Sequence, residues 1–167
     1  MVKSFVFRYY LTIALAACLL VFIIAPIVQD PVNWKLIVTI IAGILSSIYF
    51  VQKQRLEELR LFRALFTEFN ERYNNLNERL YEILRKNPDE KLEPKEIDVL
   101  YDYFNLCGEE YFYYKHGYIY PEVWKSWKNG MSIFWKDNRI REVWQDELET
   151  DSYYGLKLDF LRKPVGM

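Results

Sequence analysis

The stretch that decides the fold is residues 36–83, LIVTIIAGILSSIYFVQKQRLEELRLFRALFTEFNERYNNLNERLYEI. Residues 36–51 are uncharged, and residues 52–83 contain neither proline nor glycine. In the second part, large apolar side chains recur every three or four residues, which is typical of one long amphipathic helix. They are Leu59, Phe62, Phe66, Phe69, Tyr73, Leu76, Leu80 and Ile83. Because nothing breaks the chain at residues 51–55, we predict one continuous helix from 36 to 83.

These eight residues are called the helix seam below. Two interpretations of the seam stay open. It could pack inside the chain against later helices, or it could form a coiled coil between copies. Three phenylalanines and a tyrosine are bulky for a parallel dimeric coiled coil, which prefers branched aliphatic residues. Packing inside the chain is therefore favoured, although both arrangements can coexist.

A second uncharged run, LTIALAACLLVFIIAPIV, covers residues 11–28. A helix of this length extends for about 27 Å, close to the hydrocarbon thickness of a bilayer. The polar residues 29–33, which include Pro31, separate the two runs. Aromatic residues lie at the ends of both runs, as in the aromatic belts of membrane proteins. Residues 1–51 are therefore predicted to form a hairpin of two transmembrane helices.

Basic residues set the predicted orientation of the hairpin. Lys3 and Arg8 precede the first run, and four basic residues follow the second run between positions 53 and 63. The positive-inside rule then places both termini in the cytoplasm. The residues before Cys18 resemble a lipoprotein cleavage box, but the chain stays apolar after Cys18. A lipoprotein would become polar there, so we do not expect this processing.

The second run carries small residues at helical spacing. Ala42 and Ser46 form one pair four residues apart, and Gly43 and Ser47 form another. Such pairs let helix backbones approach closely in a membrane. They could contact the first helix of the same hairpin, or the same face of another protomer. Neither run contains a charged residue, so transport of charged substrates is not expected.

Residues 52–87 are predicted to form a long connecting helix. Residues 88–150 are predicted to form a small aromatic-rich helical bundle in the cytoplasm. Helices are expected at 95–116, from Pro121 onward, and after a cap at Asp137 or Asn138. Gly117 lies where a helix ends. Fourteen aromatic residues fall between positions 101 and 144, mostly at core spacing. Residues 151–167 are predicted to be an extended or partly ordered tail. The fold class is thus all-α.

Five residues of this bundle fall outside the main apolar spacing or form an unusual acidic pair. We regard them as a candidate partner surface: Glu109, Glu110, Tyr113, Tyr118 and Tyr120. Adjacent helix residues point about 100° apart, so the two glutamates do not readily share a proton. Cys107 and His116 could meet in space as a catalytic pair, but no nucleotide loop, catalytic triad or metal spacing is present. We expect no enzymatic activity, cofactor or metal.

No segment is basic enough to follow a nucleic-acid backbone, so direct nucleic-acid binding is not expected. Residues 87–115 carry eight acidic and three basic side chains. The basic blocks on either side of the apolar runs are better interpreted as membrane-topology signals.

The residues DYFNLCGEEY at 102–111, YKHGYI at 114–119 and the segment 124–131 resemble a family of small bacterial proteins with a membrane hairpin, a long helix and no assigned activity. The architecture is also similar to membrane effectors of bacterial anti-phage systems, including retron-associated ones. This resemblance implies the bacterial inner membrane. For a retron-type system it also implies a partner made of reverse transcriptase and nucleic acid.

The resulting functional hypothesis is a non-enzymatic, toxin-like membrane effector that compromises the bilayer and is controlled by its cytoplasmic domain. We expect a homo-oligomer and a cytoplasmic protein partner. The alternative is a membrane-anchored adaptor that recruits a cytoplasmic protein through the seam or the aromatic surface.

Overall fold

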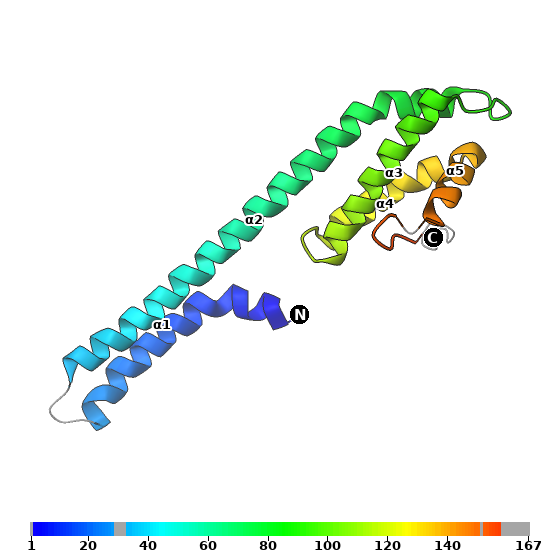
Figure 1. Cartoon of the computed structure of the whole chain (residues 1–167). Coiled ribbons are helices and arrows are strands. Elements are labelled where there is room, and N and C mark those ends of the chain that lie inside the picture. Colours follow the sequence, from blue (N-terminus) through cyan, green and yellow to red (C-terminus); the bar gives the residue numbers. More distant parts are fainter. Residues whose placement is uncertain (1, 29–32, 151, 158–167) are drawn as a thin grey trace. The chain divides into compact units, whose positions relative to one another are not determined.

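The computed structural model describes residues 2–28, 33–150 and 152–157. These residues form five helices and no strand (Figure 1). The helices are α1 (Val2–Val28), α2 (Trp34–Arg85), α3 (Pro94–Lys115), α4 (Pro121–Trp135) and α5 (Asn138–Leu148). The prediction of an all-α fold is therefore confirmed.

Helix α2 is a single helix of 52 residues, which confirms the predicted continuity from 36 to 83. At its start, the side-chain oxygen of Asn33 accepts a hydrogen bond from the backbone N–H of Leu36, at 3.2 Å. This is the usual role of asparagine before a first helical turn. At its end Arg85 supplies a basic last turn, and Pro88 follows shortly after. The local sequence thus accounts for both ends.

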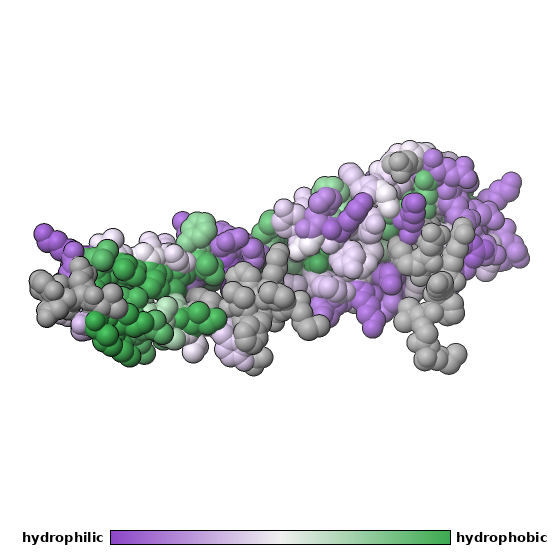
Figure 2. All heavy atoms as spheres, turned by 90° about the horizontal axis from the view of Figure 1, so that it is seen from below, coloured by the Kyte–Doolittle hydropathy of each residue, from purple (hydrophilic) through white to green (hydrophobic). Residues whose placement is uncertain are grey.

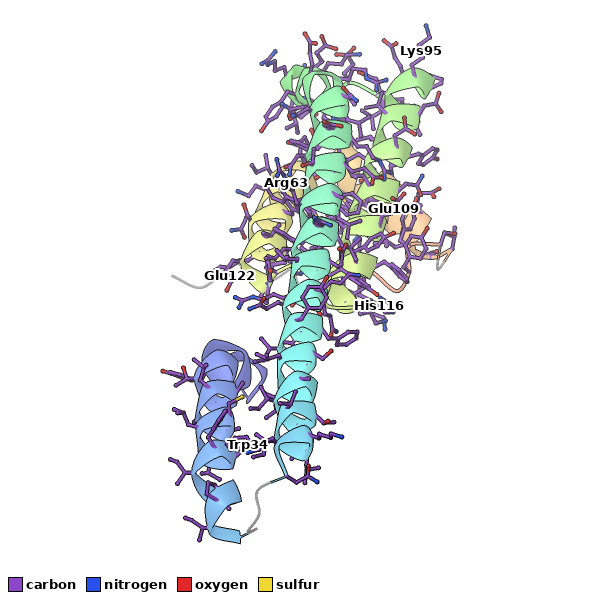
Figure 3. The ribbon with its side chains drawn as sticks, turned by 90° about the vertical axis from the view of Figure 1, so that its left-hand side faces the viewer. Trp34, Arg63, Lys95, Glu109, His116 and Glu122 are labelled. Carbon is purple, nitrogen blue, oxygen red and sulfur yellow. The ribbon has the colours of Figure 1, made fainter. Side chains whose placement is uncertain are left out.

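The chain divides into two compact units, Met1–Leu59 and Arg60–Met167. In the first unit, α1 and residues 34–59 of α2 lie side by side (Figures 1 and 3). The least exposed residues on this part of α2 are β-branched aliphatic residues at helical spacing: Ile37, Ile41, Ile44, Ile48 and Val51. Most other large apolar side chains of this unit are exposed, and Figure 2 shows hydrophobic side chains gathered there.

By length and composition, α2 is the one helix of the described chain that could cross a membrane. The apolar part of α1 whose side chains are described, Thr12–Ile24, is shorter. The predicted loop at 29–32 and the side chains of Lys3 and Arg8 lie outside the described residues.

The small residues of α2 do not pack against α1. Ala42, Gly43, Ser46 and Ser47 are all exposed, and a Cβ atom added to Gly43 would meet no atom within 4 Å. The Ser47 hydroxyl donates to the backbone oxygen of Gly43, at 2.9 Å. Packing of Gly43 against the first helix of the same hairpin is therefore a wrong expectation, because the stripe of β-branched residues faces inward instead. Contact with another protomer stays a prediction.

In the second unit, α3, α4 and α5 pack with residues 60–85 of α2 around one apolar core. Phe69, Leu76, Leu80 and Ile83 of the seam are at least 93% buried. Phe62 and Tyr73 are half-buried and pack against the same core. The interpretation that the seam packs inside the chain is thus confirmed for these residues. We call residues 60–157 the aromatic bundle.

Two seam residues are corrected by the structure. Leu59 is 45% exposed and Phe66 is 39% exposed, whereas Leu65, which the heptad omits, is 7% exposed. The physical reason is that α2 is covered from more than one side. The Phe66 ring stacks on the Trp127 ring of α4 and stays partly exposed. The buried stripe of α2 includes Leu65 instead. A stripe that meets several helices is broader than a strict coiled-coil seam.

Local signals set the other helix boundaries. The Glu93 side chain and Glu96 form a reciprocal capping box at the start of α3. Gly117 follows α3 with φ of +81°, a left-handed conformation that glycine adopts without strain. Pro121 is the first residue of α4, and the Asp137 side chain accepts hydrogen bonds from the first backbone N–H groups of α5. The predicted roles of Gly117 and Pro121 are confirmed, and of the two candidate caps Asp137 and Asn138 the structure shows Asp137.

The segment after α5 is not an extended tail where the structure describes it. Tyr153 is 4% exposed and Leu156 is 3% exposed, and both belong to the core. A Cβ atom on Gly108 would lie 3.2 Å from the Tyr153 ring, so the absence of a side chain there lets Tyr153 pack on α3. Of the two predicted alternatives, an extended or a partly ordered tail, residues 152–157 fit the second, because this contact holds the segment on the bundle. Residues 151 and 158–167 lie outside the described residues.

Candidate functional site

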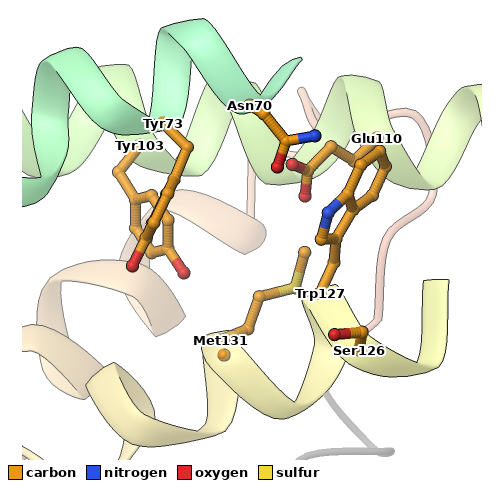
Figure 4. A pocket seen from close by; sticks show the side chains of 8 residues that line it. Asn70, Tyr73, Tyr103, Glu110, Ser126, Trp127 and Met131 are labelled. Atoms are coloured by element: carbon orange, nitrogen blue, oxygen red, sulfur yellow. The ribbon is translucent and has the colours of Figure 1, made fainter. Parts of the chain in front are cut away.

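The aromatic bundle contains a cavity of about 190 Å³ between α2, α3 and α4 (Figure 4). Each helix contributes both polar and apolar groups. The lining residues are Asn70 and Tyr73 of α2, Tyr103 and Glu110 of α3, and Ser126, Trp127, Gly130 and Met131 of α4. Gly130 is part of this lining, and a Cβ atom there would meet no described atom within 4 Å.

Glu110 is the charged residue that is buried in the described part of the core, with 6% of its surface exposed. Its carboxyl group lies in the cavity near Asn70 and Trp127 (Figure 4). Among the described residues, none makes a hydrogen bond to it. Burial raises its pKa from 4.5 to about 8, opposed by the positive charge of Arg72 and assisted by Glu109. A buried carboxyl group without a hydrogen bond is costly to keep ionised.

The neighbouring Glu109 does not face the cavity but forms an ion pair with Arg72 of α2. Its two carboxylate oxygens accept hydrogen bonds from Arg72 at 2.5 and 3.0 Å. Figure 3 shows Glu109 on α3 between Lys95 and His116. The Arg72 guanidinium also lies 5.9 Å from the centre of the Phe69 ring. The adjacent glutamates thus have different roles: Glu109 joins α3 to α2, and Glu110 faces the cavity.

Two phenols and a thiol lie on the α2–α3 side of the site. Burial raises the pKa of Tyr73 to about 12 and raises the pKa of Tyr103 and of the Cys107 thiol well above their ordinary values. These groups therefore stay protonated at neutral pH. A buried thiol with a raised pKa is a poor nucleophile.

The suggested meeting of Cys107 and His116 does not occur. Cys107 is fully buried and His116 is exposed. Nine residues of helix separate them by about 13 Å. The His116 ring instead lies 4.3 Å from the Phe112 ring, and its Nδ1 lies 2.8 Å from the Phe112 backbone oxygen.

The five residues predicted as a partner surface do not form one surface. Glu110 is buried, which contradicts its assignment, because its side of α3 faces α2 and α4. Tyr113 is half-buried, with its ring 5.7 Å from Phe69. Tyr118 and Tyr120 are each 47% exposed. Tyr120 also contacts Phe62, with ring centres 4.4 Å apart.

Most of the cavity lining lies outside the sites predicted from the sequence. Six of the eight lining residues lie outside the predicted sites: Asn70, Tyr103, Ser126, Trp127, Gly130 and Met131. With the structure known, two features of the sequence can be related to these lining residues. Gly130 interrupts a helix without ending it, and Asn70 is a polar residue directly beside the buried Phe69. Neither signal alone distinguishes a cavity from an ordinary helix surface.

A group of aromatic side chains is exposed around the end of α3. Phe112 is 37% exposed and Tyr154 is 53% exposed, with ring centres 5.3 Å apart. The Tyr113 ring connects Phe112 to Tyr118 through contacts of 5.6 and 6.0 Å. We call Phe112, Tyr113, Tyr118 and Tyr154 the aromatic patch. Half-exposed tyrosines of this kind are frequent at protein interfaces.

No protein-family model, curated protein or solved structure matches the chain. Among the described residues, no group of three His, Cys, Asp or Glu side chains is arranged to hold a metal ion.

Proposed function

We propose that this chain is a bacterial inner-membrane effector whose aromatic bundle controls a membrane-spanning hairpin. In this proposal α1 and the first part of α2 both cross the bilayer, and both termini lie in the cytoplasm. The effector is toxin-like: its assembled hairpins compromise the membrane when the bundle releases them. A role in anti-phage defence, with a cytoplasmic partner acting on the bundle, is the biological setting that this proposal favours.

The observation that carries the proposal is the continuity of α2. Its first part exposes apolar side chains such as Leu36, Val38 and Leu45, each more than half exposed. Its last part carries Leu80 and Ile83 into the core and Asn70 and Tyr73 into the cavity wall. Because no loop interrupts the helix, a change in packing at the cavity can be passed along α2 without a flexible linker absorbing it.

The exposed small residues support assembly between protomers. Gly43 and Ser47 lie four residues apart on a face with no neighbouring atoms near Gly43. Close helix contact in a membrane requires such a face. Hairpins that meet through it would form the homo-oligomer that membrane damage requires.

The test is expression in a bacterial host, with membrane potential followed by a voltage-sensitive dye and growth followed in parallel. We expect wild-type protein to depolarise the membrane and Gly43→Leu to reduce the effect, because leucine blocks close approach. Leu45→Phe is the matched control: it adds bulk at another exposed position of the same helix and keeps the effect. Unchanged potential and growth with the full chain and with residues 1–59 alone would refute the proposal.

A second candidate function, a membrane-anchored adaptor, is favoured by the aromatic patch. Phe112, Tyr118 and Tyr154 together expose apolar surface beside hydroxyl groups, as partner-binding surfaces often do. Recovery of one stoichiometric partner that is lost in Tyr154→Ser, without any depolarisation, would support the adaptor. Depolarisation that persists in Tyr154→Ser would support the effector.

A further inference from the structure

We propose that the cavity of the aromatic bundle binds a small aliphatic ammonium ion, with Glu110 as its counter-ion. This inference concerns the ligand of the bundle and does not depend on what the hairpin does in the membrane. Its test below uses binding alone, so its failure leaves the effector proposal standing.

Hydrogen-bond acceptors converge at one end of the cavity. The Glu110 carboxyl group and the Asn70 side chain both lie there (Figure 4). The Asn70 amide nitrogen already donates to the backbone oxygen of Phe66, at 2.6 Å. Its side-chain oxygen is therefore left as an acceptor. An ammonium group carries several donors and no acceptor, so it matches a carboxylate beside an amide oxygen.

The remaining walls suit the alkyl part of such an ion. Trp127, Tyr73 and Tyr103 offer aromatic surface, and Met131 offers a polarisable thioether. Aromatic faces attract cations, most strongly when water is excluded. The Ser126 side chain is exposed, so the lining reaches the molecular surface at α4 and a small ion has a route of entry.

Other ligand classes fit the lining less well. Among the described residues that line the cavity there is no lysine, arginine or histidine, so an anion would meet only the negative charge of Glu110 there. A neutral apolar ligand would cover the Glu110 carboxyl group without offering it a hydrogen-bond partner. An ammonium ion offsets the charge of Glu110 and supplies its missing hydrogen bond, which is the combination that a buried carboxylate requires.

Binding of the ammonium ion should depend on pH, because the ion competes with a proton for the Glu110 carboxyl group. The charged or titratable groups near Glu110 are Arg72 and Tyr73 on α2 and Tyr103, Cys107 and Glu109 on α3. The α4 lining residues carry none. With a pKa of about 8, Glu110 is mainly protonated at pH 6 and half ionised at pH 8. Because an alkylammonium stays charged over this range, its affinity should rise about fifty-fold from pH 6 to pH 8.

The experiment follows the methyl groups of methionine by NMR in the full-length, detergent-solubilised protein. The chain has three methionines, of which Met131 lines the cavity. n-Butylammonium chloride is the probe and n-butanol is its uncharged control. A capped glycine–lysine–glycine peptide carries the same ammonium on a protein chain. We expect n-butylammonium to shift the Met131 signal saturably, and n-butanol to bind at least about tenfold more weakly.

Variants separate a binding site from a structural role. Glu110→Gln keeps the shape and removes the charge, and should weaken n-butylammonium binding at least about tenfold and abolish its pH dependence. Gly130→Leu fills the cavity from a helix position that has room for a side chain, and should abolish binding in a folded protein. Glu122→Gln makes the same chemical change on exposed α4 and should leave binding unchanged.

Binding of the peptide as tightly as n-butylammonium would support the site and identify a lysine side chain as its source of ammonium. Tighter binding of the free amine would support a diffusible ligand. Equal binding of n-butanol and n-butylammonium, or unaltered binding by Glu110→Gln or Gly130→Leu, would overturn the proposal. So would the absence of any saturable Met131 shift in wild-type protein.

Discussion

Replacing Glu110 by glutamine should stabilise the aromatic bundle, and increasingly so as the pH rises. Burial raises the pKa of Glu110 from 4.5 to about 8. Each pKa unit corresponds to about 1.4 kcal/mol, so ionised Glu110 reduces the free energy of unfolding by about 5 kcal/mol. A group this well buried is little screened by solvent, since only 6% of its surface is exposed.

The direction of the pH effect follows from proton binding to the Glu110 carboxyl group. Because the folded pKa lies above the unfolded value, the folded state holds a proton that the unfolded chain releases more readily. The contribution of Glu110 to stability is complete below about pH 4.5 and is lost as the pH rises through about 8. Glutamine has no such proton. The difference in unfolding free energy between Glu110→Gln and wild type should thus grow by about 1.4 kcal/mol per pH unit from about pH 5 to pH 8.

The assay is urea unfolding of the full-length protein in a mild detergent, followed by near-ultraviolet circular dichroism at several pH values. Four of the five tryptophans belong to the aromatic bundle, so the signal reports mainly on its packing. Groups common to both proteins cancel in the difference between them. Asp102→Asn makes the same chemical change on the exposed face of α3 and is the matched control. An equal difference for Glu110→Gln at pH 5 and pH 8 would refute the reasoning.

Three further substitutions test the packing by the same unfolding assay. Gly130→Ala should stabilise the bundle by about 0.5–1 kcal/mol, because alanine restricts the unfolded chain and meets no atom; destabilisation would contradict the space assigned to Gly130. Gly108→Leu should destabilise it by about 1–3 kcal/mol through overpacking against Tyr153, and a neutral effect would mean that Tyr153 does not pack there. Arg139 donates to the backbone oxygen of Ile83 at 3.0 Å. Arg139→Ala should cost about 1.5–3 kcal/mol, whereas Arg141→Ala, outside this contact, is its control.

Much of the fold could be predicted because helix signals are local. The uncharged runs, the three-and-four spacing of the seam and the capping residues each depend on neighbours within a few positions. These signals correctly predicted the continuity of α2 and offered two candidate caps for α5, of which the structure shows Asp137. They also correctly favoured burial of Phe69, Leu80 and Ile83 inside the chain.

The candidate site could not be predicted in the same way. Glu109 and Glu110 are identical in type and adjacent in sequence, yet one pairs with Arg72 and the other faces a cavity. The difference arises because a helix turns about 100° per residue, so neighbouring side chains meet different helices. Which helix lies on which side is a tertiary property.

The sequence by itself determined that residues 36–83 form one helix, because backbone hydrogen bonds and apolar spacing are set within a few residues. Only the tertiary structure decided which side of that helix is covered. In the tertiary structure Leu65 is buried and Leu59 is exposed. Gly43 is exposed, and Tyr153, which follows the last helix, is buried in the core. Those outcomes depend on contacts between segments far apart in the chain, where shape and space determine which side chain is buried.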